Sequence, residues 1–259
     1  MPDQAYLKVE GVSKRFGAGE NAVAALDTVS FTLDKGRFLS ILGPSGCGKS
    51  TLFNIIAGLM QPDSGAVTLQ GASLIGRSGM TGYMLQRDLL LPWRTIRDNI
   101  TLPATLRRTK ARAAQQAAQA DIDACGLSGL LHRRPDELSG GQRQRAALVR
   151  TLQTGKEMLL LDEPFGALDA VTRLRLQELL TAMCLQKHLT VLFVTHDVDE
   201  ALLLSDELLI MGSSPGRILR HIVLPDARPR SIHTLARPDY AALKADILDL
   251  LHKEDELHA

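Results

Sequence analysis

The sequence predicts an α/β fold with a mixed or parallel sheet, an N-terminal antiparallel β subdomain and an inserted α-helical subdomain. Dense apolar runs at residues 37–42, 158–161, 190–194 and 208–211 predict buried strands, and a helix-like stretch precedes each of the last three. That alternation is typical of crossover units that feed a parallel sheet. The chain has 259 residues, of which 45% are hydrophobic, so it is long enough for one domain with a substantial core.

The N-terminal part, residues 5–42, is rich in strand-forming patterns. Val29, Phe31 and Leu33 alternate with polar neighbours, which predicts a half-exposed antiparallel sheet. The denser run that follows, residues 37–42, ends at a glycine and predicts a central strand.

The middle of the chain, residues 104–124, is rich in Ala, Gln and Arg and predicts a helix that ends before Gly126. We expect the buried stripe of this helix at Ala113, Ala117, Ala120 and Ala124, and we expect the helical insertion to cover residues 87–153 of a domain at 1–224. Residues 225–259 form a basic, proline-containing segment and a last helix. The apolar face of that helix, which we expect to dock on the domain, carries Leu243, Ile247, Leu250 and Leu251.

Composition excludes several classes of protein. A formal net charge of +1 lacks the basic excess of a nucleic-acid binder, so we expect no nucleic-acid partner. The three cysteines are far apart in the sequence, which predicts neither a disulfide framework nor a zinc site. No apolar run reaches the roughly 18–20 residues of a membrane-spanning helix. The charged first ten residues do not match a signal peptide, so we expect a chain that is not exported.

A glycine-rich loop stands between the predicted central strand and a helix-like stretch at residues 52–59. Glycines let backbone N–H groups turn toward phosphate oxygens, Lys49 reaches the terminal phosphates, and the Ser50 hydroxyl is a ligand for Mg²⁺. The alternative is a glycine turn without a ligand. The predicted phosphate-binding residues are Gly43, Pro44, Ser45, Gly46, Cys47, Gly48, Lys49, Ser50 and Thr51.

Cys47 lies inside this loop, close in sequence to Lys49 and to a helix N-terminus. Both features lower the pKa of a thiol. We therefore expect Cys47 to be alkylated readily and to be protected by bound nucleotide.

A second motif is the apolar strand at residues 158–161, which ends in Asp162 and Glu163. Acids at the carboxyl end of a buried parallel strand lie where such folds bind ligands. Asp162 is thus a candidate Mg²⁺ ligand, and Glu163 can face an attacking water. Ordinary solvated acids at a strand end are the alternative.

The third motif is the helix start Ser139, Gly140, Gly141 and Gln142, in which Ser139 is a natural N-cap. With the preceding leucine it resembles the signature motif of the ATP-binding cassette (ABC) ATPases. The resemblance covers residues 6–211 and implies a P-loop NTPase core that binds ATP and Mg²⁺.

Four further positions match the family's pattern. Phe16 resembles the aromatic residue that stacks on adenine, with a core aromatic as the alternative. Gln86 resembles the Q-loop glutamine that contacts Mg²⁺ and water, with a solvated loop glutamine as the alternative. Asp169, in residues 167–169, resembles the D-loop, and His196 resembles the switch histidine at the γ-phosphate.

The resemblance also implies a mechanism, in which two cassettes, expected to be identical, sandwich two ATP molecules head to tail. The phosphate loop of one chain then faces Ser139, Gly140 and Gly141 of the other. In this implied mechanism Glu163 acts as the general base or polarises the attacking water, His196 holds the γ-phosphate and the water in line, and Asp169 couples the two sites across the interface.

Most family members drive transport, so the resemblance implies integral membrane permease subunits as partners and a peripheral location on the cytoplasmic face of the inner membrane. Residues 89–100 form an apolar loop around Trp93 that is suited to a short permease helix, unless the tryptophan is simply packed. Together with residues 213–218 and 237–240, the loop resembles ATPase subunits of nitrate, sulfonate and taurine importers. In such importers an extracytoplasmic solute-binding protein and the permease select the solute.

Three alternatives remain open: an exporter subunit, a non-transport ABC ATPase and a small-molecule kinase with a phosphate loop. Import is favoured over export by the tryptophan loop and the C-terminal strings. The chain carries neither a second cassette nor a long coiled-coil insertion, as a non-transport member would. The signature motif and His196 argue against a kinase.

Overall fold

The computed structural model describes residues 5–17, 19, 22–166, 168–213 and 215–256. One sheet is antiparallel, with strand order β2-β1-β4-β5. Its strands are β1 (Leu7–Phe16), β2 (Val23–Leu33), β4 (Ser64–Leu69) and β5 (Ala72–Ser73). Val29, Phe31 and Leu33 of β2 are buried and their neighbours are exposed, so the alternation in the sequence predicted the buried face correctly.

The second sheet has the order β10-β9-β3-β8-β7-β6 and is parallel except for β10, which pairs antiparallel with β9. Every residue of β3, β7 and β8 is buried, as their dense apolar runs predict. The predicted α/β class is therefore confirmed. The strands are β3 (Phe38–Leu42), β6 (Gly82–Met84), β7 (Met158–Asp162), β8 (Thr190–Val194), β9 (Glu207–Gly212) and β10 (Arg217–Val223).

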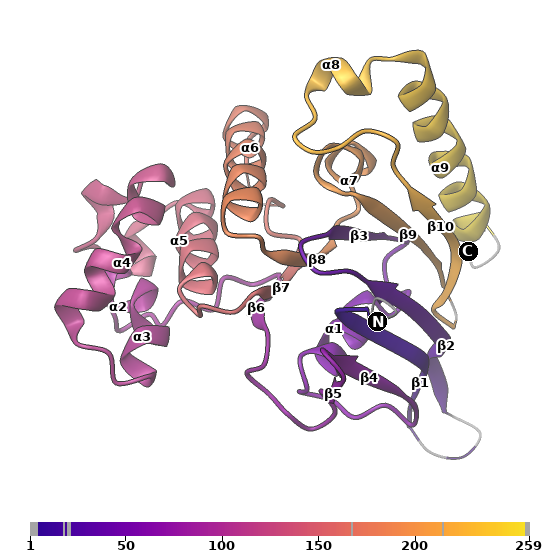
Figure 1. Cartoon of the computed structure of the whole chain (residues 1–259), viewed down its shortest axis with the longest axis horizontal. Coiled ribbons are helices and arrows are strands. Elements are labelled where there is room, and N and C mark those ends of the chain that lie inside the picture. The colour runs from indigo at the N-terminus through magenta and orange to yellow at the C-terminus, as the bar shows by residue number, and fades with distance from the viewer. Residues whose placement is uncertain (1–4, 18, 20–21, 167, 214, 257–259) are drawn as a thin grey trace.

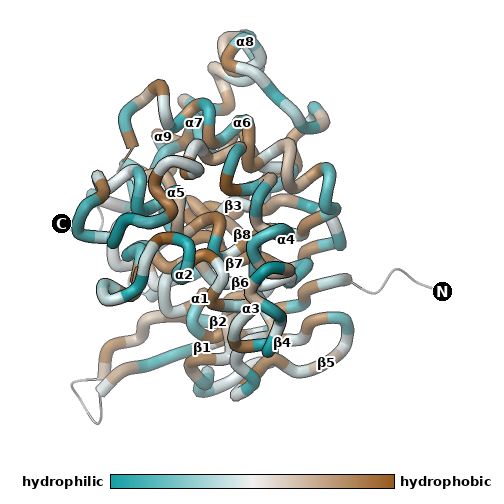
Figure 2. Tube along the Cα trace, turned by 90° about the vertical axis from the view of Figure 1, so that its left-hand side faces the viewer, coloured by the Kyte–Doolittle hydropathy of each residue, from teal (hydrophilic) through white to brown (hydrophobic). Residues whose placement is uncertain are grey.

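Helices pack around these sheets and form a separate lobe on one side (Figure 1). Near the sheets lie α1 (Lys49–Ile56), α6 (Ala170–Gln186) and α7 (Val198–Leu204). The lobe, between β6 and β7 in the chain, contains α2 (Ile96–Ile100), α3 (Leu102–Leu106), α4 (Ala111–Ala124) and α5 (Gly140–Leu152). Figure 2 shows the hydrophobic residues gathered on the central strands.

The buried face of α4 differs from the prediction. Ala114, Ala118, Asp121 and Ile122 are buried, whereas the four alanines expected to form the stripe are exposed. In an alanine-rich helix several stripes have the same small apolar residues, so the single large one, Ile122, decides which face packs. The helix also begins later than expected, because residues 107–110 separate it from α3.

The C-terminal segment folds back onto the parallel sheet, as predicted. It contains α8 (Ile232–Leu235) and α9 (Pro238–Glu256). Ile247 is fully buried in a cluster with Tyr240 and Leu42, and Leu243, Leu250 and Leu251 pack against that cluster. The predicted domain boundary at residue 224 and the limits of the helical insertion stay predictions.

No helix in the described ranges combines the length and apolar character needed to span a bilayer. The cysteines Cys47, Cys125 and Cys184 are free and buried.

Candidate functional site

Three of the predicted motifs meet in one cleft of about 330 Å³ at the carboxyl ends of the parallel strands. Ligands of open α/β sheets bind at this edge. The cleft joins residues up to 149 positions apart in the chain. It is lined by Ser45, Gly46, Gly48, Lys49, Ser50, Thr51, Gln86, Asp162, Glu163 and Val194.

The phosphate loop depends on glycine at two positions of its turn. Gly46 and Gly48 have φ angles of +82° and +90°, which L side chains rarely adopt. A Cβ on Gly48 would also lie 2.5 Å from the carbonyl oxygen of Ala25. This turn leads into α1, whose N-cap, Gly48, makes no side-chain hydrogen bond and whose first turn holds no acid. The backbone N–H groups there fit an anion such as a phosphate.

The Lys49 ammonium is held inside the loop by backbone oxygens. Its Nζ donates to the carbonyl oxygens of Gly43, at 2.8 Å, and of Pro44, at 2.7 Å. The side chain is nearly buried and lines the cleft, so its charge adds to the positive potential there.

Cys47 corrects one prediction. Its side chain is fully buried, and burial raises the pKa of the thiol by more than the nearby Lys49 ammonium lowers it. The expected reactive thiol is therefore wrong, because the side chain points into the core under the loop and desolvation outweighs the positive charge. Neither Cys47 nor Gly43 and Pro44 lines the cleft itself.

The acidic strand end carries oxygen ligands. Ser50 Oγ donates to Asp162 Oδ2 at 3.3 Å, and burial raises the pKa of the Asp162 carboxyl. Among the described residues, no three His, Cys, Asp or Glu side chains are grouped to hold a metal. A hydroxyl and one carboxylate facing a phosphate-sized cleft are nevertheless the partial oxygen set that Mg²⁺ takes together with substrate phosphates.

Glu163 is held in an unusual conformation. Its φ of +47° lies in the left-handed region, which costs a non-glycine residue about 1–3 kcal/mol. The backbone N–H of Glu163 donates to the Val194 carbonyl at 3.0 Å, which fixes the turn. Glu163 Oε2 accepts from Gln86 Nε2 at 3.1 Å, and Glu163 Oε1 lies 3.3 Å from His196 Nδ1. Three of the predicted catalytic side chains therefore meet at one carboxylate.

The signature helix start lies outside this cleft. Ser139 and Gln142 form a reciprocal capping box, in which Gln142 N–H donates to Ser139 Oγ and Ser139 N–H to Gln142 Oε1. Gly140 lines a different groove, of about 430 Å³, together with Gln86 and residues 87–90. Within one chain, Ser139, Gly140, Gly141 and Gln142 are not brought to the phosphate loop.

Two other predicted residues are also exposed. Phe16, at the end of β1, is 43% exposed with the Lys14 ammonium 5.8 Å from its ring centre, so a core aromatic is the wrong interpretation. Asp169 is the N-cap of α6. Its carboxylate accepts a hydrogen bond from the Thr172 backbone N–H, and this bond lowers the pKa of the carboxyl. Ala167, Ser214 and residues 1–4, which belong to other predictions above, lie outside the described residues.

The sequence interpretation missed the side chains behind His196. Arg173, Asp197 and Glu200 line a cavity of about 30 Å³ together with Glu163 and His196. The signal was present, because Asp197 and Glu200 have the spacing of an acidic N-cap and its third helical residue. Nothing in the sequence pointed to Arg173 as their neighbour.

Comparisons with known proteins show the family of the chain. A family model described as "ABC transporter" matches residues 26–166. The chain is 38% identical over 252 residues to the nitrate import ATP-binding protein NrtD of Synechococcus elongatus, covering 96% of this chain and 92% of NrtD. It is 40% identical over 254 residues to the bicarbonate transport ATP-binding protein CmpC of the same species, of which it spans 38% of the length.

A solved structure, the dimeric ABC transporter cassette MJ0796, is similar with a TM-score of 0.78 and 29% identity. The match covers 85% of this chain and all of that one. MJ0796 is also known in a dimeric post-hydrolysis state bound to ADP and Pi.

Proposed function

This chain belongs to the ABC transporter family, and from that premise we propose that it is the ATP-hydrolysing subunit of an importer. The observation that carries the proposal is the convergence of Lys49, Asp162, Glu163 and Gln86 on one cleft, with His196 against Glu163. The cargo we propose is nitrate, a sulfonate, taurine or a related small solute, since NrtD is named as a nitrate import protein.

The residues of the cleft divide into binding and proton-moving groups. The N–H groups at the start of α1 and the Lys49 ammonium bind the phosphates of ATP. Ser50, Asp162 and Gln86 would hold Mg²⁺, which when bound neutralises charge on the transferring phosphate.

Glu163 accepts a proton from the attacking water. At the same time the water oxygen bonds to the γ-phosphorus, and ADP leaves. Its contacts with Gln86 and His196 orient the carboxylate for that step, and His196 holds the γ-phosphate.

A second cassette completes the site. Ser139, Gly140 and Gly141 do not line the cleft of their own chain, and the start of the helix they open offers backbone N–H groups to an anion. In a head-to-tail pair, which we propose to be a homodimer, they reach the ATP of the partner. The exposed Asp169 then lies at the interface. Phe16 stacks on adenine.

The permease partner has a candidate docking surface. Trp93 is 69% exposed and Leu89 is 51% exposed, so the tryptophan is not packed. Leu89 lines the groove of about 430 Å³ together with Gln86, and Trp93 lies further along the same loop. We propose that a short permease helix binds there, which places the chain at the cytoplasmic face of the inner membrane. A solute-binding protein acts outside through the permease.

Glu163→Gln tests the enzymatic part of the proposal. Loss of the proton acceptor should lower kcat for ATP by about 10²–10⁴-fold, because that is the usual contribution of a general base. ATP binding should persist, and the variant should form an ATP-dependent dimer on size exclusion. The control is Glu178→Gln, an exposed glutamate of α6. Hydrolysis by Glu163→Gln at the parent rate would overturn the assignment.

Uptake tests the transport part. Cells whose only copy carries Glu163→Gln should lose uptake of one of labelled nitrate, taurine or an alkanesulfonate. If uptake of all three persists, the proposed cargo class is wrong. Trp93→Ala tests the docking surface. We expect this variant to lose binding to the solubilised permease while its ATPase activity stays unchanged.

A further inference from the structure

Arg173 connects two loops that the proposed function treats separately. It lies in the first turn of α6, just after the D-loop residue Asp169. Its Nη2 donates to the Leu168 carbonyl at 3.2 Å, and its Nη1 lies 3.4 Å from Asp197 Oδ2. One planar guanidinium thus contacts the residue before Asp169 and the residue after His196. A guanidinium can serve two acceptors in fixed directions, which an ammonium on a flexible stem does not.

Hydrogen bonds among Thr195, Asp197 and Glu200 hold the loop that carries His196. Thr195 Oγ1 donates to Glu200 Oε2 at 2.7 Å and accepts from the Asp197 N–H at 3.0 Å. Asp197 Oδ1 accepts from the N–H groups of Asp199 and Glu200 and so caps α7. The other carboxylate oxygen of Asp197 remains for Arg173.

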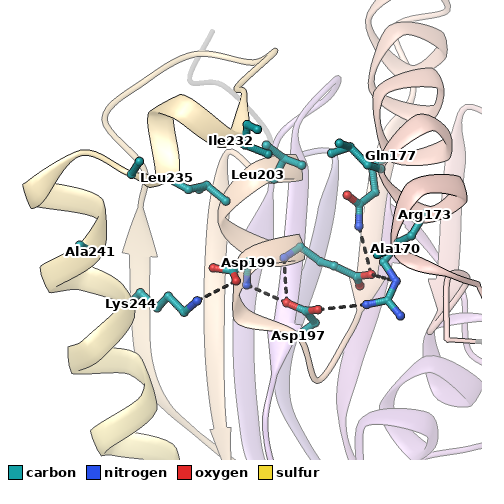
Figure 3. Close-up of a pocket in the computed structure, with 13 residues that line it drawn as sticks. Ala170, Arg173, Gln177, Asp197, Asp199, Leu203, Ile232, Leu235, Ala241 and Lys244 are labelled. Carbon is teal, nitrogen blue, oxygen red and sulfur yellow. Dashed lines mark hydrogen bonds and ion pairs between the residues drawn. The ribbon is translucent and has the colours of Figure 1, made fainter.

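Glu200 anchors this network in the core. It is 6% exposed, accepts from Gln177 Nε2 at 3.1 Å, and lies 3.8 Å from Arg173 Nε. Figure 3 shows Arg173 and Gln177 reaching from α6 toward Asp197 and the start of α7. The charges that face Arg173 are therefore those of Asp197, the N-cap of α7, and Glu200, the third residue of that helix.

The His196 side chain itself is 70% exposed, and its contact in the site is the Glu163 carboxylate. Packing around the imidazole is therefore too sparse to set its position. The backbone of residues 195–197 sets it instead, and that backbone is fastened through Asp197 and Thr195.

We propose that Arg173 is a positioning residue that joins the D-loop to the switch loop within one chain. A displacement of the D-loop by the partner cassette moves the Leu168 carbonyl, and the shared guanidinium passes the displacement to Asp197 and so to His196. The proposal rests on the proposed ATPase function. It adds a defined contact through which a displacement at one ATP site of the dimer changes the position of His196 at the other.

The test compares Arg173→Gln and Arg173→Lys with Arg175→Gln, an arginine on the same helix outside these contacts. We expect Arg173→Gln to lower kcat about tenfold while the Kd for trinitrophenyl-ATP stays within twofold of the parent value. Arg173→Lys should have the urea midpoint of the parent, because it keeps a charge beside Asp197 and Glu200. Its kcat should nevertheless stay several-fold below the parent value. If the role of Arg173 were purely structural, Arg173→Lys would restore kcat together with stability.

Asp197→Asn provides a second test, since asparagine keeps the cap of α7 but loses the charge. The double variant with Arg173→Gln should be no slower than Arg173→Gln alone. Additive losses, or Arg173→Gln activity equal to that of Arg175→Gln, would overturn the proposal while leaving the ATPase function intact. A parent chain that does not hydrolyse ATP would overturn both.

Discussion

Replacing Gly48 by alanine should destabilise the protein more than the same change at Gly46, although the two glycines lie in one loop. Both have a positive φ, so both variants incur the left-handed cost of about 1–2 kcal/mol, part of which is offset by lower entropy of the unfolded chain. The added methyl groups differ in surroundings. At Gly46, apart from its two chain neighbours, no atom of the described residues lies within 4 Å of the position that a Cβ would take, so conformation is the whole cost.

At Gly48 the Cβ would lie 2.5 Å from the Ala25 oxygen and 2.7 Å from Leu26 Cδ2. The Ala25 oxygen also accepts the Gly216 N–H at 3.1 Å, so moving it disturbs a second chain segment. Overpacking of this kind costs about 1–3 kcal/mol. The free energy of unfolding of Gly48→Ala should therefore fall below that of Gly46→Ala by about that amount.

Urea unfolding followed by far-ultraviolet circular dichroism measures both values. The slope of free energy against urea should be the same in the two variants, so that the midpoints compare stability directly. Equal stabilities would contradict the expected difference, because they would mean that the loop relaxes around the methyl group without cost. Greater loss in Gly46→Ala would contradict the geometry of the turn itself.

Three other outcomes are expected. The Cys47 thiol, buried and with a raised pKa, should react with iodoacetamide at least tenfold more slowly in the folded chain than in urea, and mass spectrometry of the labelled peptides measures this. Ile247→Ala should cost about 2–5 kcal/mol in urea unfolding, whereas Leu248→Ala, at a 36% exposed position, should cost under about 1 kcal/mol. Burial raises the pKa of the Asp162 carboxyl above its ordinary 3.8, so the native state binds this proton more tightly and its charged form lowers stability as pH rises. Asp162→Asn should thus unfold at higher urea than the parent at pH 7, an advantage that shrinks toward pH 4 and whose absence at pH 7 would contradict the assignment.

Local patterns carried most of the fold. Dense apolar runs located β7 and β8 within a residue, because a strand covered on both faces needs apolar side chains at consecutive positions. The alternation in β2 indicated its buried face for the same kind of reason. The turn before α1 was also predictable, since the positive φ of Gly46 and Gly48 is a steric requirement that is local in sequence, whereas phosphate binding by this loop stays a prediction.

Predictions failed where the outcome depended on the direction of a side chain. Charge neighbours in sequence suggested a reactive Cys47, but the side chain points into the core. The spacing of alanines could not choose between faces of α4. The contact of Arg173 with Asp197 joins α6 to the N-cap of α7, and it depends on how these two helices pack together, so no pattern along the chain predicts it.

Leu42, the last residue of β3, packs in the same cluster as Tyr240 and Ile247 of α9. The residue that follows it, Gly43, supplies a carbonyl oxygen to Lys49. The C-terminal helix therefore forms part of the support beneath the nucleotide cleft, although none of its described side chains lines that cleft. A factor that displaced α9 would loosen the base of the phosphate loop without entering the cleft. This ATPase can therefore be regulated from a surface remote from its substrate.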